Sequence, residues 1–359
     1  MSAKTILLLV ALAVCVSPAA ANTYYVGTCK SGSFPTISAA VNSSSVPPGS
    51  TIKICAGIYT EQVIISKDLT LEGIDGLSNV LGSPLGSGAI LESPSSIEAT
   101  TSPVFAGNGY LEVEIAPIIW VTAGTVNIEN VSVYGAGAYP GGATEVGFYY
   151  ASGASGTLNH VGFLGDAPAV GIWAENANNS QTSVTIENSY SYAGIVAGSL
   201  VQGKLAVKII GNQVSLAQPR LDAGLAYGIY VYQVSGTVEA NFISERGPAD
   251  DAYSGIQVDG MVAADVTISG NSIQTTDPWD PFPGHIGQDW TGIIIHVDGA
   301  IIKSNKISGA QTGIDMGCHA ATVSGNTIML SLSAFNNVPA GFKGVNSLYN
   351  NVYNNFFTC

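Results

Sequence analysis

The chain has 359 residues, of which 46% are hydrophobic and only 10% are charged, and it carries a formal net charge of −14. This composition excludes a disordered chain, which is usually highly charged, and a helical bundle or coiled coil, which is rich in Glu, Lys and Leu. Because so few basic side chains are present, nucleic acid is not expected as a partner.

The N-terminus is typical of a signal peptide over residues 1–21. A short polar start ends at Lys4, an apolar stretch covers Ile6–Val16, and Ala19–Ala21 offers small residues for cleavage. The apolar stretch is about 11 residues long, too short for a membrane span, and no later apolar run reaches the ~18 residues a span needs. Cleavage would release a secreted or cell-surface protein that starts at Asn22. An anchored N-terminus is the alternative.

Four cysteines follow the leader, and an even number in an exported chain predicts disulfide bonds. Of the three possible pairings, proximity in sequence favours Cys29–Cys55 and Cys318–Cys359. Free buried thiols are the alternative. No C-x-x-C spacing occurs, so a zinc site is not expected.

The first elements are predicted over residues 22–72, as an N-terminal cap and the first coils of a repeat. Phe34–Val41 is a short amphipathic segment and the only credible helix, placed to cap the first coil. Strands are expected at Thr51–Cys55 and Val63–Ile65. Residues 73–117 are rich in Gly, Ser and Pro, which predicts irregular loops.

An internal repeat occupies residues 118–330, at steps of about 21 to 34 residues. A short β-rich run ends in asparagine eight times. A second marker, a glycine followed by an apolar residue, recurs along the chain at similar spacing. The asparagines are Asn130, Asn159, Asn188, Asn212, Asn241, Asn271, Asn305 and Asn326. The marker glycines are Gly147, Gly171, Gly194, Gly228, Gly255, Gly292 and Gly313.

Each repeat unit contains runs with period two, which predicts short strands. Units of this length predict an all-β solenoid of about ten to twelve coils, stacked about 4.8 Å apart. Inward Ile, Val and Ala would form one continuous core. The asparagines would bend the chain in the left-handed region and join their amides in a ladder. A single domain over residues 22–359 follows, with residues 331–359 as the last coil and cap.

Four short motifs near the N-terminus carry a family resemblance: Phe34–Val41, Pro48–Ile52, Gly57–Glu61 and Leu69–Gly73. They resemble the opening of the pectin lyase-like superfamily, whose members are right-handed parallel β-helices. The resemblance implies that fold. It implies no single activity, because the superfamily includes glycan lyases, polygalacturonases, pectin methylesterases and adhesins without activity. The catalytic motifs of its pectin-active enzymes have no complete match in this chain; Asp250–Asp251 and Gly284–His285 are fragments of the polygalacturonase motif.

The repeat register aligns outward side chains on one sheet, because alternate residues of a strand point to opposite faces. Two residues after each marker glycine the column contains Tyr149, Trp173, Val196, Tyr230, Gln257, Ile294 and Asp315. Four residues after it the column contains Ala151, Glu175, Gly198, Tyr232, Asp259, His296 and Gly317. Exposed aromatic rings beside carboxylates are suited to a sugar chain, which stacks on the rings and hydrogen-bonds through its hydroxyls.

The columns predict substrate-binding residues, and the longest insertion, 275–291, adds two tryptophans that could wall the same groove. The predicted substrate-binding residues are Trp173, Glu175, Tyr230, Gln257, Trp279 and Trp290. Tryptophans that merely pack beneath their own loop are the alternative.

A catalytic group is predicted around Asp259 and His296, which fall on adjacent coils of one column. A carboxylate beside an imidazole raises its pKa and fixes its tautomer, as a general base or acid requires. Tyr232 could supply a proton. Asp259 and Asp315 could instead form the carboxylate pair of a glycosidase. A surface salt bridge without chemistry is the alternative.

The sequence thus predicts a secreted β-helix protein that binds an extracellular polysaccharide and, if it is an enzyme, cleaves it as a lyase or glycoside hydrolase. The alternative is a non-catalytic cell-surface, adhesin-like or filament-forming β-helix, which would self-associate. No cofactor is expected. Ca²⁺ is the one ion considered, because it could bridge an anionic glycan, although no calcium-loop spacing is met. The acids considered for it are Asp250, Asp251, Asp277 and Asp280.

Overall fold

The computed structural model describes residues 22–74, 88–106, 109–135, 142–165, 169–216, 226–245, 253–263, 265–275, 290–339 and 348–359. The predicted leader, 1–21, lies outside these residues, as do 246–252 and 276–289. Within the described ranges, no helix has the length and apolar character to cross a membrane. Apart from one short helix, the described chain is built of strands.

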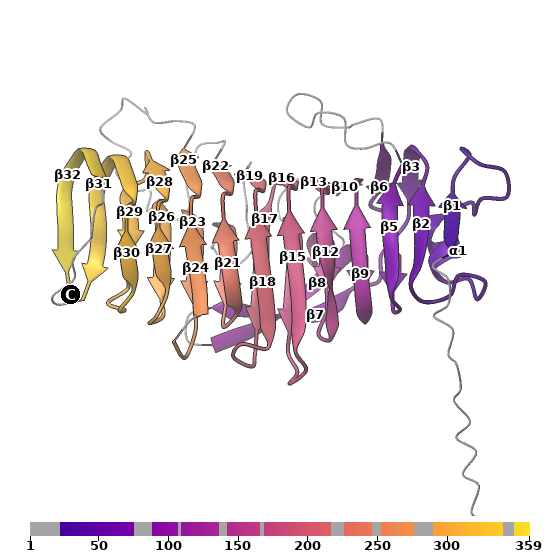
Figure 1. The fold of residues 1–359 in the computed structure, drawn as a ribbon, viewed down its shortest axis with the longest axis horizontal. Helices are drawn as coiled ribbons and strands as arrows, with labels where there is room; N and C mark the ends of the chain where they lie inside the picture. Colours follow the sequence, from indigo (N-terminus) through magenta and orange to yellow (C-terminus); the bar gives the residue numbers. More distant parts are fainter. Residues whose placement is uncertain are drawn as a thin grey trace, which may run out of the picture.

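The strands wind into a right-handed parallel β-helix with three strands in a regular coil (Figure 1). The first ladder holds 11 strands, in agreement with the ten to twelve coils predicted from the repeat. Its strands are β1 (Thr23–Val26), β2 (Ser50–Ile54), β5 (Leu69–Gly73), β9 (Gly124–Glu129), β12 (Ala154–Asn159), β15 (Thr182–Glu187), β18 (Leu205–Ile210), β21 (Ser235–Glu239), β24 (Asp265–Ser269), β27 (Ile301–Lys303) and β30 (Thr322–Ser324).

The second ladder follows after a bend of the chain. Its strands are β3 (Gly57–Thr60), β6 (Ala89–Glu92), β10 (Val131–Tyr134), β13 (Gly162–Leu164), β16 (Tyr190–Ser191), β19 (Gln213–Leu216), β22 (Phe242–Glu245), β25 (Ser272–Thr275), β28 (Lys306–Ser308) and the first half of β31 (Thr327–Val338).

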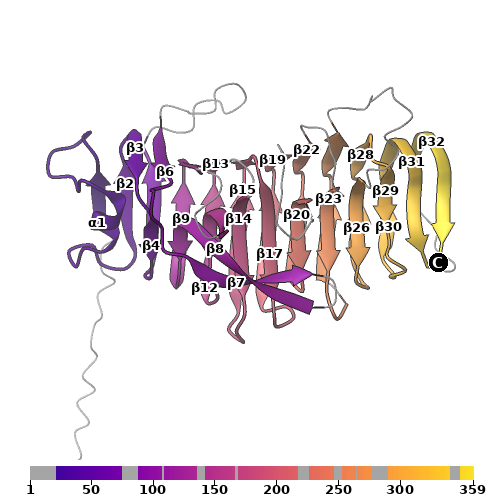
Figure 2. The same ribbon diagram turned by 180° about the vertical axis from the view of Figure 1, so that it is seen from behind.

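The third ladder forms the face seen in Figure 2. Its strands are β4 (Val63–Ile65), β8 (Gly109–Val121), β11 (Thr144–Tyr150), β14 (Ala169–Asn176), β17 (Gly194–Ser199), β20 (Ala226–Tyr232), β23 (Tyr253–Asp259), β26 (Thr291–His296), β29 (Thr312–Asp315), the second half of β31, and β32 (Leu348–Thr358). Because β31 runs through the corner, it joins the second and third ladders into one sheet.

The helix α1 covers Ile37–Val41 and is shorter than the predicted Phe34–Val41. Phe34 instead forms a bridge with Val26, and the Thr36 side chain accepts a hydrogen bond from the backbone of Ala39 at 3.1 Å, as an N-cap residue does. The Glu61 carboxylate accepts from the first two backbone N–H groups of the helix, at 2.7 and 2.9 Å. The helix lies at the N-terminal end of the solenoid (Figure 1); its role as a cap stays a prediction.

Residues 73–117 differ from the prediction of irregular loops, because strands β6 and β7 (Thr100–Ala106) lie within them and β8 begins there. β7 pairs antiparallel with β8, with Thr100 opposite Ile115 and Ala106 opposite Gly109. This pair is the one antiparallel element in the described part of the chain. It leaves the solenoid and crosses the outer face of the third ladder (Figure 2).

The marker glycines are needed because adjacent coils approach closely at their positions. A Cβ on Gly255 would lie 2.6 Å from the carbonyl oxygen of Gly292 and 2.5 Å from Cγ2 of Ile273. No side chain fits at such distances unless the backbone moves. The same contact with the next marker glycine recurs at Gly228 and Gly292, so this column fixes the register of the third ladder.

The predicted asparagine roles are divided between two neighbouring positions. Asn212, Asn241, Asn271, Asn305 and Asn326 are buried, and each of the first four donates its side-chain amide to Oδ1 of the next at 2.9–3.0 Å. The left-handed backbone lies one residue earlier, for example at Ala240 (φ 54°) and Ser304 (φ 56°). Asn130 and Asn188 occupy this left-handed position, so they bend the chain and do not belong to the buried ladder.

Both disulfides favoured by proximity are present. Cys29 is bonded to Cys55, with the Cα atoms 5.7 Å apart, and Cys318 is bonded to Cys359, with the Cα atoms 5.9 Å apart. One bond therefore fastens the first coils and the other fastens the last strand, β32.

Candidate functional site

The two predicted columns exist in the third ladder. Strand pairing aligns Tyr149, Trp173, Val196, Tyr230, Gln257, Ile294 and Asp315 on successive strands. It likewise aligns Glu175, Gly198, Tyr232, Asp259 and His296. The repeat register therefore predicted which residues are neighbours in space.

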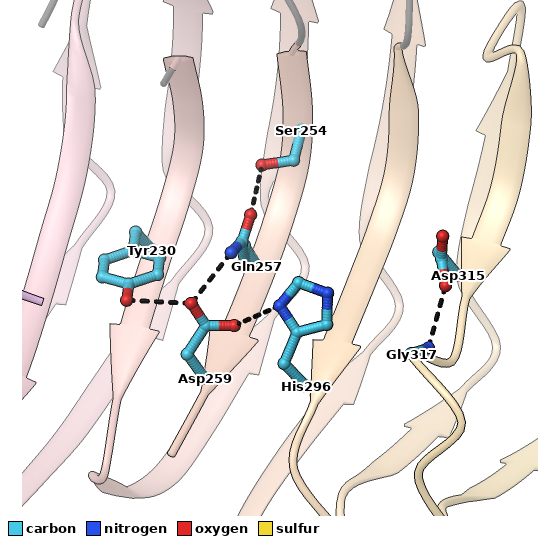
Figure 3. Close-up of polar contacts among 7 residues, drawn as sticks. All are labelled: Tyr230, Ser254, Gln257, Asp259, His296, Asp315 and Gly317. Carbon is cyan, nitrogen blue, oxygen red and sulfur yellow. Dashed lines mark hydrogen bonds and ion pairs between the residues drawn. The ribbon is translucent and has the colours of Figure 1, made fainter. Parts of the chain in front are cut away.

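Asp259, the last residue of β23, is the centre of a hydrogen-bonded cluster (Figure 3). Its Oδ2 accepts from the hydroxyl of Tyr230 at 3.0 Å and from the amide of Gln257 at 2.9 Å. Gln257 in turn accepts from Ser254 at 3.4 Å. Asp259 is only 1% exposed, so these donors replace the water that a carboxylate would otherwise bind.

His296 ends the next strand, β26, and binds the other oxygen of Asp259. Its Nδ1 lies 2.9 Å from Oδ1 of Asp259, while its side chain is 44% exposed. The hydrogen bond to Asp259 raises the pKa of His296, and the nearby charge of Asp315 acts in the same direction. Because Nδ1 faces the carboxylate, Nε2 is the nitrogen available for chemistry.

Asp315 lies on the following strand, β29, in the column of Gln257. The side-chain amide of Asn337 donates to both of its oxygens at 2.9 Å, and the amide of Asn336 donates to one at 3.4 Å. The backbone N–H of Gly317 also donates to it, at 2.8 Å. Asp315 and both asparagines are half-buried, so this end of the third ladder presents carboxylate and amide groups to solvent.

The prediction of an open aromatic face is not met. Trp173 is 1% exposed, Tyr230 is 2% exposed and Tyr232 is 1% exposed. They belong to a second hydrophobic cluster on the outside of the third ladder, next to Ile115 and Val113 of β8. The register did predict the face on which these rings lie, but the β7–β8 hairpin crosses that face (Figure 2).

Glu175 is also covered, although it was predicted to contact substrate. The buried Ser102 of β7 donates its hydroxyl to Oε2 of Glu175, and Ser152 donates to Oε1 at 3.4 Å. Burial raises the pKa of this carboxyl, while the hydrogen bonds from Ser102 and Tyr149 oppose that shift.

The tyrosines beside Asp259 are held in their neutral form. Burial, and then the charge of Asp259, raise the pKa of Tyr230 and of Tyr227, whose ring stacks on that of Tyr230 at 4.6 Å. Burial likewise raises the pKa of Tyr232. Tyr230 is therefore a hydrogen-bond donor to Asp259, and the proton-donor role predicted for Tyr232 stays a prediction.

The predictions for Trp279 and Trp290, the two tryptophans of the insertion 275–291, have to be considered separately. Trp290 is 5% exposed and packs in the main interior core, so its predicted place in a groove wall is not met. Trp279 lies outside the described residues, with Asp250, Asp251, Asp277 and Asp280. Among the residues that the structure does describe, no group of three or more His, Cys, Asp or Glu side chains could hold a metal ion.

Several residues of the site were not predicted from the sequence. Ser102 and the β7–β8 hairpin were missed, although Glu112–Ile115 has the period-two alternation of a strand. Asn336 and Asn337, which hold Asp315, lie in the tail that was assigned to the cap. One more step of the repeat from Asp315 leads to Asn336 and would have found them.

No protein-family model matches the chain, and no curated protein matches it by sequence. Among solved structures, it is similar to a lacto-N-biosidase of family GH136 from Eubacterium ramulus, with a TM-score of 0.45 and 11% identity over 94% of this chain and 68% of that chain. A pectin methylesterase in complex with a hexasaccharide has a TM-score of 0.41 and 12% identity, over 70% and 78% of the two chains. PfbA, a surface adhesin of Streptococcus pneumoniae, has a TM-score of 0.33 and 12% identity, over 86% and 85%.

These identities are too low to transfer an activity to the chain. The architecture rests on the strand pairing itself, which gives three parallel ladders wound around one continuous core. The chain has the right-handed parallel β-helix fold that its resemblance to the pectin lyase-like superfamily implied.

Proposed function

We propose that the protein is a glycan-directed β-helix whose reactive group is His296, at the open C-terminal part of the third ladder. The observation that carries the proposal is the pair in which a buried Asp259 carboxylate holds a half-exposed imidazole at 2.9 Å. Asp315, Asn336 and Asn337 lie beside it and offer the carboxylate and amide groups that sugar hydroxyls bind.

Proton transfer is the chemistry that this arrangement supports. The carboxylate accepts a hydrogen bond from Nδ1 of His296, so the lone pair of neutral His296 is at Nε2. With a neutral glycan, that nitrogen can accept a proton from the water that attacks the glycosidic bond in a hydrolysis. A lyase reaction would need a uronate, because only its carboxylate makes a sugar C–H acidic enough for the imidazole to remove. Asp259 itself is poorly suited to act as a glycosidase carboxylate, because both of its oxygens are already engaged.

The charge of the chain favours a neutral glycan. With a net charge of −14, an anionic polysaccharide would be repelled unless cations bridged it. We place the protein outside the cell, secreted or at the cell surface, because two disulfides at the ends of the solenoid suit an oxidising compartment.

The test is a panel of neutral and anionic polysaccharides, followed for binding and for new unsaturated or reducing ends. We expect product formation to be lost in His296→Ala and strongly reduced in Asp259→Asn. His319→Ala is the matched control, because His319 forms an exposed pair with Asp298 at 3.3 Å on the same part of the chain. Turnover that survives His296→Ala would refute the catalytic part of the proposal, and no binding to any glycan would refute the whole.

A second candidate is a non-catalytic, self-associating surface protein. It is favoured by the last two strands, β31 and β32, which contain no charged residue over 12 and 11 residues. Long uncharged strands at the end of a sheet can pair with another chain. Sedimentation velocity over a range of concentrations distinguishes the two: reversible assembly without glycan binding would favour this candidate.

A further inference from the structure

The outer face of the third ladder carries a layer of aromatic side chains that the mechanism above does not use. Strand pairing aligns Trp120 with Tyr149 and Tyr149 with Trp173, and Tyr227 stacks on Tyr230 further along. We call these five residues the covered aromatic layer. The covered aromatic layer ends beside the catalytic candidates, because Tyr230 is paired in register with Gln257 and donates a hydrogen bond to Asp259.

The layer is covered by a segment that does not belong to the solenoid. β7 pairs only with β8, so Thr100–Ala106 adds nothing to the three ladders. Its described polar contacts with the face beneath are made by Ser102, which donates to Glu175, 73 residues later in the chain, and is hydrogen-bonded to Tyr149. Within β8, pairing with β11 and β4 begins only at Ile115, so β7 and the part of β8 before Ile115 can leave this face without breaking a ladder of the β-helix.

The hairpin is a poor polar partner for the layer. The indole Nε1 atoms of Trp120 and Trp173 are both buried, and neither has a hydrogen-bond partner among the described residues. Leaving a buried donor unpaired costs roughly 1–3 kcal/mol, so native structures rarely tolerate two of them on one face. The Glu175 carboxylate is satisfied only by hydroxyl groups, those of Ser102, Ser152 and Tyr149.

We infer that the covered aromatic layer is a binding surface for a neutral oligosaccharide, and that the β7–β8 hairpin occupies it when no sugar is bound. Sugar rings would stack on the aromatic faces, sugar oxygens would accept from the two indole N–H groups, and sugar hydroxyls would replace Ser102 at Glu175. The inference rests on the proposed function and extends its site from β23 towards β8.

The electrostatics of the layer favour a neutral sugar over a uronate. Glu175 and Asp259 are the carboxylates that border it, and no Lys or Arg is a member of the cluster as far as the chain is described. An anionic glycan would meet like charge without a counterion. Neutral hexaoses of the cello, chito and manno series are therefore the probes, with an oligogalacturonate as the charged comparison.

The experiment displaces the hairpin by charge. Ser102→Glu places a second carboxylate beside Glu175, whereas Thr101→Glu adds the same charge on the exposed side of the same strand. We expect Ser102→Glu to increase acrylamide quenching of tryptophan fluorescence and to tighten binding of one neutral hexaose about tenfold, because the hairpin no longer competes. Thr101→Glu should change neither, and Trp173→Ala should abolish the gain.

Ser102→Ala is the second variant, since it removes the hydroxyl donor with little change in volume and remains informative if Ser102→Glu does not fold. Increased quenching without tighter binding would show that the layer is only a packing core and would overturn the inference. Unchanged quenching in both folded Ser102 variants would overturn it as well.

If His296→Ala loses turnover while the hairpin variants bind no better, the inference fails and the proposed function stands. If turnover survives His296→Ala but Ser102→Glu binds the hexaose more tightly, the inference stands and the catalytic part of the proposed function fails.

Discussion

Gly317 lies directly against the imidazole of His296, on the side away from Asp259 (Figure 3). A Cβ at Gly317 would be 2.6 Å from Cδ2 of His296 and 2.6 Å from the carbonyl oxygen of Ile295. The backbone of Gly317 has a φ of 50°, and its N–H is bonded to Asp315. The ring is therefore held between a hydrogen-bonding carboxylate and a residue without a side chain.

Gly317→Ala should displace the imidazole from Asp259. The added methyl group cannot fit beside Cδ2 unless the ring or the turn moves, so we expect a large change in the His296 NMR signals and at least about a tenfold loss of any His296-dependent turnover. Gly203→Ala is the matched control, because Gly203 has a φ of 65° but a methyl group there would have no neighbouring atom within 4 Å. It should cost only the strain of a left-handed alanine, about 1 kcal/mol. Equal effects of the two changes on His296 would contradict this explanation.

Asp259→Asn should lower the pKa of His296. The neutral amide cannot stabilise the imidazolium as the carboxylate does, so the NMR titration of His296 should move to lower pH. Asp298→Asn is the control, since Asp298 is paired with His319 and not with His296, and it should leave the His296 titration unchanged. A His296 titration that is unchanged in Asp259→Asn would show that the pair has no electrostatic coupling.

The same pair should make stability depend on pH. Because the folded pKa of His296 is raised above the unfolded value of 6.5, the folded state binds a proton more tightly. The resulting stabilisation is fully present below about pH 6.5 and is lost as the pH rises through the folded pKa. Urea unfolding as a function of pH should show this loss, and the loss should be smaller in Asp259→Asn.

Asn271→Ala should be strongly destabilising. Its amide donates to the carbonyl of Val238 and to Asn305 at 2.9 Å, and its Oδ1 accepts from Asn241. Removing it leaves several buried groups unpaired, so we expect a loss of about 2–4 kcal/mol in the free energy of unfolding. Asn159→Ala, at a half-buried position outside the buried ladder, should cost about 0.5 kcal/mol or less. Similar losses in the two variants would show that the ladder does not act through burial.

Cys318→Ser with Cys359→Ser should loosen the C-terminal end locally. The loop closed by this disulfide has a sequence separation of 41, for which chain entropy gives a stabilisation of about 4 kcal/mol. In a solenoid each coil contacts mainly its neighbours, so faster amide hydrogen exchange should appear in β31 and β32 and not in β2. Removing Cys29 and Cys55 should give the opposite pattern. Uniform exchange along the chain in either variant would mean that the coils unfold as one unit.

The spacing of the marker glycines was enough to predict the fold and the neighbours of Asp259 and His296. Parallel stacking repeats one residue position per coil, so a periodic sequence specifies which side chains are adjacent. The asparagine signal was less specific, because a bending residue and a ladder residue are consecutive in the chain. Asn188 and Asn212 therefore look alike in sequence, although one has a φ of 51° and the other is 1% exposed.

Burial of the aromatic face was not predictable from the repeat. Trp173 is outward by register, yet it is only 1% exposed, in a cluster that includes Ile115 and Val113 of β8. The hairpin that buries this face comes from a segment without the sequence period of the solenoid. Aligning the repeats therefore cannot predict that the face is buried. The position of Trp290 was mispredicted for a related reason. Trp290 lies at the end of the insertion, immediately before β26, where the repeat register no longer indicates direction, and its side chain packs in the core.

Charge contributes little to holding this molecule together. In the part of the chain that is described, Lys53 with Glu72 is the one ion pair between a lysine or arginine and a carboxylate, and both side chains are about one-third exposed. The cohesion comes instead from aliphatic rows, backbone ladders and uncharged amides, which ionic strength hardly screens. We therefore expect the solenoid to keep its shape in fresh water, brine or mild acid alike, so that changes of medium act on the loops and on His296 rather than on the scaffold.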